Sequence, residues 1–271
     1  MNLIKGHKTF NGVTRFWSHQ SKITKTEMKF STFIPENPQG AIIWLSGLTC
    51  NEENFITKAG AQKYLSEHNL MVICPDTSPR GLNLPGEHDS YDFGSGAGFY
   101  VNATTDDYKN NYLMDDYIMK EIVPMLKNDF KMERISITGH SMGGHGALVL
   151  GLRNPEVFSS ISAFSPIVHP SQCPWGEKAF TGYLGSNKAD WAKYDATELV
   201  KAGHKHPKNI LIHQGTHDEF LTRELLTTDF IDACVEMEQE QEVVFCDEYD
   251  HSYYFISTFI ESHILHHKKF L

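Results

Sequence analysis

The 271-residue sequence lacks the features that mark several specialised classes of protein. No run of 18 apolar residues occurs, so we expect no membrane-spanning helix and no membrane partner. Lys and Arg form no long block, and acidic residues outnumber them 34 to 24, which gives a net charge of −10. A nucleic-acid partner is therefore not expected. The charged N-terminal residues precede no apolar stretch, so no signal peptide is expected.

Cysteine is also scarce, and its pattern is informative. The chain has an odd number of cysteines and no C-x-x-C pair among them; the five are Cys50, Cys74, Cys173, Cys234 and Cys246. This pattern excludes a disulfide framework or a structural zinc site and favours a reducing cytoplasm. We expect neither a metal nor another cofactor. With 40% hydrophobic residues, the chain can bury one sizeable core.

The hydrophobic pattern predicts an α/β protein. Polar and apolar residues alternate over 14–18 and 25–34, which predicts antiparallel edge strands. Continuous apolar runs at 41–45 and 70–74 are typical of strands buried on both faces. Further strands are predicted at 134–138, 158–165, 209–213 and 242–245, and helices at 54–68, 111–130, 144–152, 221–237 and 252–267.

Strand and helix therefore alternate at least five times after residue 41, which predicts three layers around a mainly parallel sheet. We expect residues 1–271 to form a single domain, with an irregular insertion at 166–207. Residues 76–107 are rich in glycine and aspartate and read as a long ordered loop, a kind of segment that is usually functional.

The most specific motif is Gly-His-Ser-Met-Gly at 139–143, which matches G-x-S-x-G. A predicted strand precedes it and a predicted helix follows, as a nucleophile elbow requires. The sharp turn strains the serine backbone and brings the neighbouring chain close, so a side chain at either position two residues from the serine would collide. Glycine is therefore required at both positions. Ser141 would then stand at the carboxyl edge of the sheet over a helix N-terminus. The competing interpretation is a glycine-rich helix start with a capping serine.

A serine nucleophile needs a general base, and the base needs an orienting carboxylate. In this arrangement the chain order is serine, acid, histidine, each after a later strand. Asp218 follows the strand at 209–213, and His251 follows the strand at 242–245. Their rivals fit less well. None of the rivals Asp190, Asp195, Asp229 and Asp232 lies just beyond a strand end. His145 is expected to pack in or support the elbow helix, and a solvated C-terminal helix face is predicted for His263, His266 and His267.

Acyl transfer also needs donors for the oxygen that becomes negative. One donor should be the backbone N–H of Met142, which follows the nucleophile, and the other should come from the loop at 46–50, from Leu48. Each such donor contributes about 3–4 kcal/mol to transition-state stabilisation. Cys50, in the same loop, is either a small buried residue or a thiol whose alkylation would crowd Ser141.

Along almost its full length, the sequence resembles the S-formylglutathione hydrolase family, also called esterase D. The resemblance is carried by several segments besides the elbow, and these are Leu-Ser-Gly-Leu-Thr-Cys at 45–50, Phe-Ile-Thr-Lys at 55–58, Gly-Phe-Tyr-Val at 98–101, Cys-Pro-Trp-Gly at 173–176, Tyr-Asp-Ala-Thr at 194–197 and Asp-His-Ser-Tyr-Tyr-Phe at 250–255. It departs from the family at His213, where an acidic residue is usual, and at Glu224, where glutamine is usual.

The resemblance implies an α/β-hydrolase fold, with a mostly parallel sheet and antiparallel N-terminal strands. It implies a cytoplasmic enzyme, dimeric in many members, that hydrolyses S-formylglutathione to glutathione and formate and also cleaves short-chain esters. The family triad falls on Ser141, Asp218 and His251, and its oxyanion donors fall on Leu48 and Met142. Two alternatives stay open: a general short-chain carboxylesterase, and a hydrolase-fold binding protein without catalysis.

Overall fold

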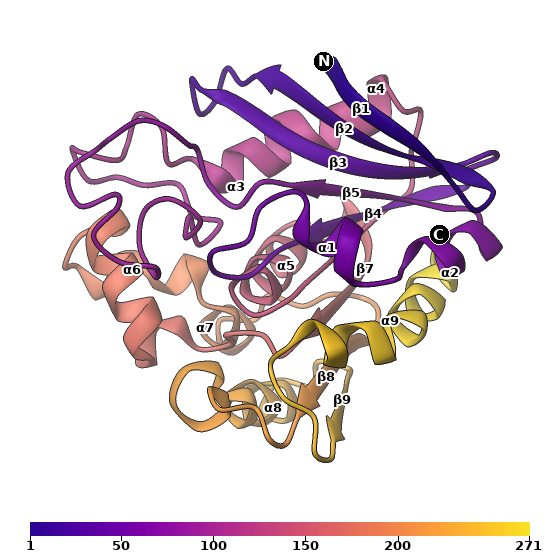
Figure 1. Ribbon diagram of the computed structural model, residues 1–271. Coiled ribbons are helices and arrows are strands. Elements are labelled where there is room, and N and C mark those ends of the chain that lie inside the picture. The colour runs from indigo at the N-terminus through magenta and orange to yellow at the C-terminus, as the bar shows by residue number, and fades with distance from the viewer.

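The computed structural model describes residues 1–271, and all nine of its strands join one twisted sheet (Figure 1). The strands lie side by side in the order β1-β2-β3-β5-β4-β6-β7-β8-β9. The first three are antiparallel to their neighbours, and β4 to β9 run parallel to one another. The mainly parallel sheet with antiparallel N-terminal strands is therefore confirmed. The prediction that 14–18 and 25–34 form edge strands was wrong, because β1 pairs with the outer side of β2 and β5 pairs with β3. The strands are β1 (Asn2–Thr9), β2 (Gly12–Gln20), β3 (Glu27–Pro35), β4 (Gly40–Leu45), β5 (Leu70–Pro75), β6 (Ile135–Gly139), β7 (Phe158–Phe164), β8 (Ile210–Gly215) and β9 (Gln241–Cys246).

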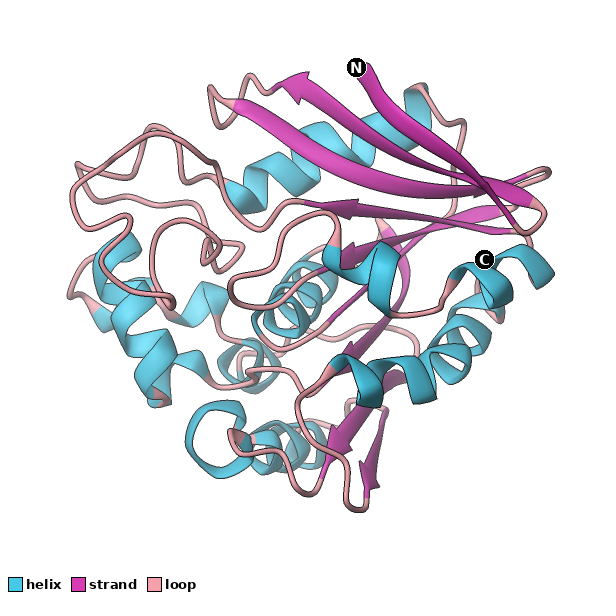
Figure 2. Ribbon diagram, viewed as in Figure 1, coloured by secondary structure: helices cyan, strands magenta, loops and turns pink.

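Side chains on the central strands alternate between two hydrophobic cores. On β4, Ile42 and Trp44 enter one core, whereas Ile43 and Leu45 enter the other. This alternation follows from the two-residue period of a strand. Helices cover both faces of the sheet, which confirms the three-layer architecture (Figure 2). One core packs under α1 (Asn54–Lys58), α2 (Gln62–Glu67) and α9 (Tyr253–Lys268); the other packs under α3 (Met114–Tyr117), α4 (Val123–Asn128), α5 (Met142–Arg153), α6 (Pro174–Leu184), α7 (Ala196–Lys201) and α8 (Thr227–Glu236).

One continuous helix was predicted for 54–68 and for 221–237, but the structure divides both, whereas the helix predicted at 111–130 is continuous from 114 to 128 and contains a π-helical turn. The 54–68 segment divides into α1 and α2 around Gly60, whose φ of +65° ends the first helix. In the 111–130 segment, a π-helical turn at Ile118–Ile122 joins α3 to α4, and Pro124 occupies the first turn of α4, where its missing N–H costs least. The 221–237 segment is interrupted at Leu226, with φ 55°. No helix has the length and apolar character needed to cross a bilayer.

Strand β1 was not predicted, because it has no buried face. It pairs with β2 from Asn2 opposite Ser18 to Thr9 opposite Gly12, at the edge of the sheet. Nearly all of its residues are exposed, so no hydrophobic period marks the strand in the sequence.

The long loop at 76–107 and the irregular segment at 166–207 are bonded to each other, largely through one tyrosine. The Tyr183 hydroxyl accepts a hydrogen bond from Gly94 N–H at 2.9 Å, and the Tyr183 carbonyl accepts one from Thr104 N–H at 2.7 Å. Thr105 adds a bond from its hydroxyl to the Gly182 carbonyl at 2.7 Å. These bonds give the long loop a fixed shape.

The C-terminal histidines are buried, so the prediction of a solvated helix face was wrong. Imidazole nitrogens of His263 and His267 each lie 2.8 Å from the Ser162 hydroxyl on β7. His263 Nε2 also lies 3.0 Å from His213 Nδ1 on β8. Small serines on the strand leave room for these rings, and a polar face of the helix is matched by a polar patch of the sheet. We refer to His213, His263, His267, Ser160 and Ser162 as the histidine network.

Acid should destabilise the protein through these buried rings. Burial lowers the pKa of His263 and His267 well below 6.5 and that of His266 to about 4. The folded state keeps all three neutral, whereas the unfolded chain takes up protons below pH 6.5. Stability is therefore full above that pH and is lost as the pH falls. Between pH 7.5 and 5.5 we expect the free energy of unfolding to drop by about 1 kcal/mol per histidine, measured from urea transitions.

The exposed His204 provides a control. The His204→Gln variant should show the same dependence on pH as the unmodified protein. A urea midpoint that does not change between pH 7.5 and 5.5 would contradict the prediction.

Candidate active site

Ser141 occupies a strained turn between β6 and α5. Its φ of 57° and ψ of −118° lie outside the regions that non-glycine residues ordinarily adopt. The two glycines of the motif are needed because the chain passes close by. A Cβ on Gly143 would lie 2.0 Å from the Leu45 carbonyl oxygen, and one on Gly139 would lie 2.3 Å from the Gly143 carbonyl oxygen. The G-x-S-x-G spacing therefore reflects a real steric requirement here.

Asp218 and His251 are in direct contact. Asp218 follows β8 and His251 follows β9, and the His251 Nδ1–H donates to Asp218 Oδ2 at 2.6 Å. The carboxylate is fully buried and also accepts from the Phe220 N–H at 3.0 Å and from Gln214 Nε2 at 3.4 Å. Because the carboxylate fixes the proton on Nδ1, the other ring nitrogen, Nε2, is left as a base.

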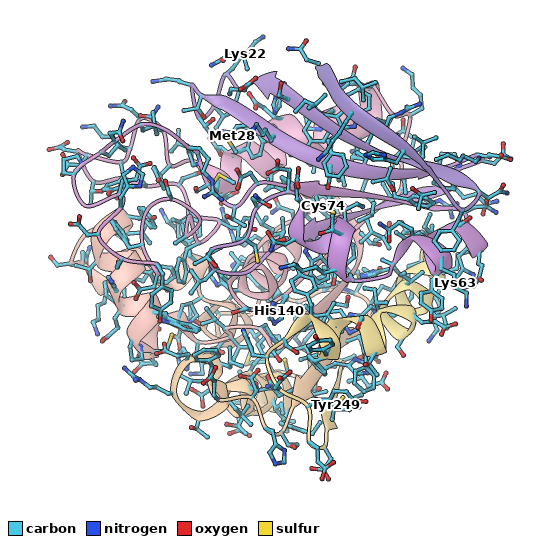
Figure 3. The ribbon with its side chains drawn as sticks, viewed as in Figure 1. Lys22, Met28, Lys63, Cys74, His140 and Tyr249 are labelled. Carbon is cyan, nitrogen blue, oxygen red and sulfur yellow. The ribbon has the colours of Figure 1, made fainter.

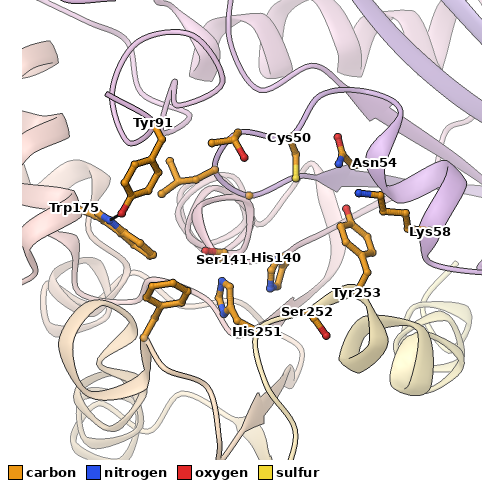
Figure 4. A pocket seen from close by; sticks show the side chains of 14 residues that line it. Cys50, Asn54, Lys58, Tyr91, His140, Ser141, Trp175, His251, Ser252 and Tyr253 are labelled. Carbon is orange, nitrogen blue, oxygen red and sulfur yellow. Dashed lines mark hydrogen bonds between the residues drawn. The ribbon is translucent and has the colours of Figure 1, made fainter. Parts of the chain in front are cut away.

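Ser141 and His251 line the same pocket, with the His251 ring beside the Ser141 side chain (Figure 4). The Ser141 hydroxyl makes no hydrogen bond to His251 in this structure. Such contacts are commonly long in unliganded enzymes and shorten when substrate binds. Ser141, Asp218 and His251, drawn from three distant parts of the sequence, thus converge at one place.

Two backbone N–H groups beside Ser141 have no hydrogen-bond partner within the protein. They belong to Met142, the first residue of α5, and to Leu48 in the loop after β4. The loop comes very close to the serine, since a Cβ on Gly47 would lie 3.1 Å from Ser141 Cβ. Both predicted oxyanion donors are therefore free and adjacent to the candidate nucleophile.

Residues of the long loop hold the Leu48 segment in place, which gives a specific role to a loop that was predicted only to be ordered and functional. The Cys50 carbonyl accepts hydrogen bonds from the Thr77 hydroxyl at 2.6 Å and from Arg80 Nη2 at 3.0 Å. Arg80 is in turn bonded to the buried Asp76 carboxylate at 2.7 Å. The Tyr100 hydroxyl donates to the Ser46 carbonyl at 2.9 Å. Carbonyls that are fixed in this way keep the loop from turning its N–H groups away.

The pocket over Ser141 has a volume of about 360 Å³, near the lower end for a small-molecule site. Tyr91, Trp175 and Phe220 form an aromatic wall on one side, where Trp175 Nε1–H donates to the Tyr91 hydroxyl at 3.0 Å. Figure 4 shows Asn54, Lys58 and Tyr253 on the opposite side of Ser141. None of these wall residues was predicted as a site residue, although Lys58, Trp175 and Tyr253 lie in segments that carry the family resemblance.

His140 packs against the His251 ring, near the centre of the molecule in Figure 3. Its ring centroid lies 4.3 Å from that of His251, and burial, with His251 as a second cause, lowers the pKa of His140 well below 6.5. His140 is therefore neutral, so it would not oppose a positive charge on the neighbouring His251 ring. His145 has a supporting position, with its Nε2–H donating to the Phe99 carbonyl at 2.9 Å.

Cys50 lies half-buried at the edge of the pocket, so it is a thiol near Ser141. Burial raises the pKa of the Cys50 thiol, and the positive charge of Lys58 only partly opposes this effect. The thiol is thus protonated at neutral pH and is a weak nucleophile.

The fold and this constellation define a hydrolase of the esterase class. Residues 21–266 match a family model described as "Putative esterase". S-formylglutathione hydrolase of Rattus norvegicus is 50% identical over 99% of this chain and 98% of the rat protein, and that of Arabidopsis thaliana is 48% identical over 99% and 97%. A solved S-formylglutathione hydrolase from Agrobacterium tumefaciens is 42% identical, covers both chains completely and superposes with a TM-score of 0.97.

The chain belongs to the S-formylglutathione hydrolase family. The predicted family, fold and enzyme class are thereby confirmed.

The close contact at the elbow predicts that Gly143→Ala will inactivate the protein. The new methyl group would overlap the Leu45 carbonyl and push α5 away from β4, which moves Ser141 and the Leu48 loop apart. We expect loss of more than about 3 kcal/mol of stability, or insoluble protein, together with loss of esterase activity. Thermal unfolding and hydrolysis of an acetyl ester measure the two effects.

Gly6→Ala on the exposed strand β1 is the matched control, because the nearest atom to its Cβ is a flexible Arg15 side-chain carbon at 3.4 Å. If Gly143→Ala were as stable and active as Gly6→Ala, the steric argument would be wrong.

Proposed function

We propose that this chain hydrolyses S-formylglutathione to glutathione and formate by way of a formyl-serine intermediate. The proposal is supported by nearly full-length similarity to S-formylglutathione hydrolases of animals and plants. The single observation that carries the mechanism is the 2.6 Å contact between buried Asp218 and His251 in the pocket that Ser141 lines.

In the first half of the reaction, the Ser141 oxygen attacks the formyl carbon, and His251 Nε2 takes the hydroxyl proton. The imidazolium that forms is stabilised by the adjacent Asp218 carboxylate. The carbonyl oxygen becomes an oxyanion and accepts hydrogen bonds from the Leu48 and Met142 N–H groups. The tetrahedral intermediate then collapses. The carbon–sulfur bond breaks, and the leaving thiolate receives the proton from His251.

In the second half, His251 removes a proton from water as the water oxygen attacks the formyl carbon of the ester. The same two N–H groups hold the second oxyanion. Collapse breaks the bond between the formyl carbon and the Ser141 oxygen, which regains a proton from His251. Formic acid leaves and loses its remaining proton to water to give formate. No redox step or cofactor is needed for this sequence of bond changes.

The acyl group must be small, because Ser141 sits deep in its turn and is 3% exposed. Leu48 and the aromatic wall line the pocket that Ser141 faces. Formyl and acetyl groups fit such a site, whereas a long acyl chain would have to displace these side chains.

We further propose that residues 1–271 act as one domain, in the cytoplasm and as a homodimer. The shared nine-stranded sheet supports a single domain. Five free cysteines and a substrate made from reduced glutathione suit a reducing compartment. The exposed edge strand β1, with Leu3 and Ile4 more than half exposed, offers a surface that a second copy would cover.

Replacing Ser141 by alanine should lower kcat for S-formylglutathione by about a millionfold, as for other triad nucleophiles. The measurement is steady-state release of glutathione by purified protein. Ser257→Ala, on the exposed side of α9, is the control and should leave kcat unchanged. Residual turnover above about a hundredth of that of the unmodified protein would overturn the assignment.

The choice of leaving group tests the two alternatives. We expect kcat/KM for S-formylglutathione to exceed that for a simple acetyl ester by at least about tenfold, because the thiolate leaves easily and the tripeptide adds contacts. The reverse preference would identify a general carboxylesterase. Failure of a fluorophosphonate probe to label Ser141 would instead favour a binding protein without catalysis.

A further inference from the structure

One cation faces the catalytic pocket, and no anion does. Lys58 at the end of α1 is the only lysine or arginine among the residues that line the pocket, and none of them is Asp or Glu. In a protein with a net charge of −10, this region of local positive charge lies where the substrate binds. The pocket is therefore suited to an anionic group, although the whole protein repels anions at long range.

Lys58 is also free to bind such a group. Many lysines of this protein form ion pairs, for example Lys5 with Glu53 at 3.0 Å and Lys178 with Asp92 at 2.5 Å. Lys58 has no carboxylate within ion-pair distance, and its ammonium instead lies 5.6 Å from the centre of the Tyr253 ring. An unpaired ammonium on a long, exposed side chain can turn toward a ligand without first breaking an ion pair.

Lys58 is placed on a definite side of the reacting atoms. It projects beside Asn54 and Tyr253, across Ser141 from Tyr91 and Trp175 (Figure 4). Helix α1 begins shortly after the loop that carries Leu48, so the same segment positions an oxyanion donor and this cation. A substrate with its acyl carbon at Ser141 would extend its leaving group toward one of these two walls.

We propose that Lys58 binds the glycine carboxylate of the glutathione leaving group. This inference rests on the proposed function. Glutathione has two carboxylates, and the one on the γ-glutamyl residue stands next to an ammonium group. Lys58 would repel that ammonium, and the pocket offers it no acidic partner. The glycine carboxylate is an isolated anion, so it is the group that matches an isolated lysine.

The test compares Lys58→Met, which keeps the length of the side chain but removes its charge, with Lys58→Arg, which keeps the charge. For S-formylglutathione we expect Lys58→Met to raise KM by about three- to tenfold with kcat nearly unchanged, and Lys58→Arg to restore most of the binding. Raising the salt concentration should reduce the difference, because the contact is exposed to solvent.

Two controls separate a local contact from a general effect of charge. Lys63→Met removes an exposed charge far from His140 in Figure 3 and should leave KM unchanged. An S-formylglutathione whose glycine carboxylate is converted to an amide should bind the unmodified protein and Lys58→Met equally well. The proposal would be overturned if Lys58→Met raised KM for the amide substrate as much as it raises KM for S-formylglutathione. It would also be overturned if Lys63→Met raised KM for S-formylglutathione as much as Lys58→Met does.

Different experimental results would contradict the proposed function and the proposed role of Lys58. If the unmodified protein shows no preference for S-formylglutathione over an acetyl ester, the substrate assignment is wrong. If that preference is present but Lys58→Met leaves KM unaltered, the assignment stands and the role of Lys58 is refuted.

Discussion

The close approach of the first turn of α5 to the end of β4 is the constraint on which the site depends. At Gly143 there is no room for even one methyl group against the Leu45 carbonyl. This contact holds Ser141 in its strained conformation, and it also fixes the start of the loop that carries Leu48. Ser141 and the free N–H groups of Met142 and Leu48 are thus set relative to each other by one packing contact, before any substrate arrives.

The parallel sheet accounts for the remaining convergence. Leu48, Ser141, Asp218 and His251 each lie a few residues beyond the carboxyl end of a strand, namely β4, β6, β8 and β9. Parallel strands bring their carboxyl ends to the same edge of the sheet, so residues that are distant in sequence lie close together there. The loop at 76–107 then completes the site from outside the sheet, through the bonds of Thr77 and Arg80 to the Cys50 carbonyl.

Local patterns predicted much of this arrangement. Continuous apolar runs predict buried strands, and the spacing of glycines around Ser141 predicts the nucleophile elbow. The sheet and the positions of Ser141, Asp218 and His251 could therefore be predicted from the sequence. What was not accessible depends on tertiary contacts. Strand β1 has no buried face to give a period, the π-turn at Ile118–Ile122 leaves no simple signature, and the burial of His263 is decided by Ser162 on a distant strand. The pairing of Arg80 with Asp76 likewise appears only once the loop is folded.

The histidine network has a consequence for the position of His251. Hydrophobic side chains tolerate small sliding of one surface over another, but a row of directional bonds between α9 and strands β7 and β8 is satisfied in only one alignment. A shift of the helix by one residue would leave several buried nitrogens without partners. His251 lies two residues before the first residue of α9. The hydrogen bonds that fix α9 on the sheet therefore also determine where the His251 imidazole lies along the edge of the sheet. The position of His251 in the pocket thus depends on buried polar groups that do not line the pocket.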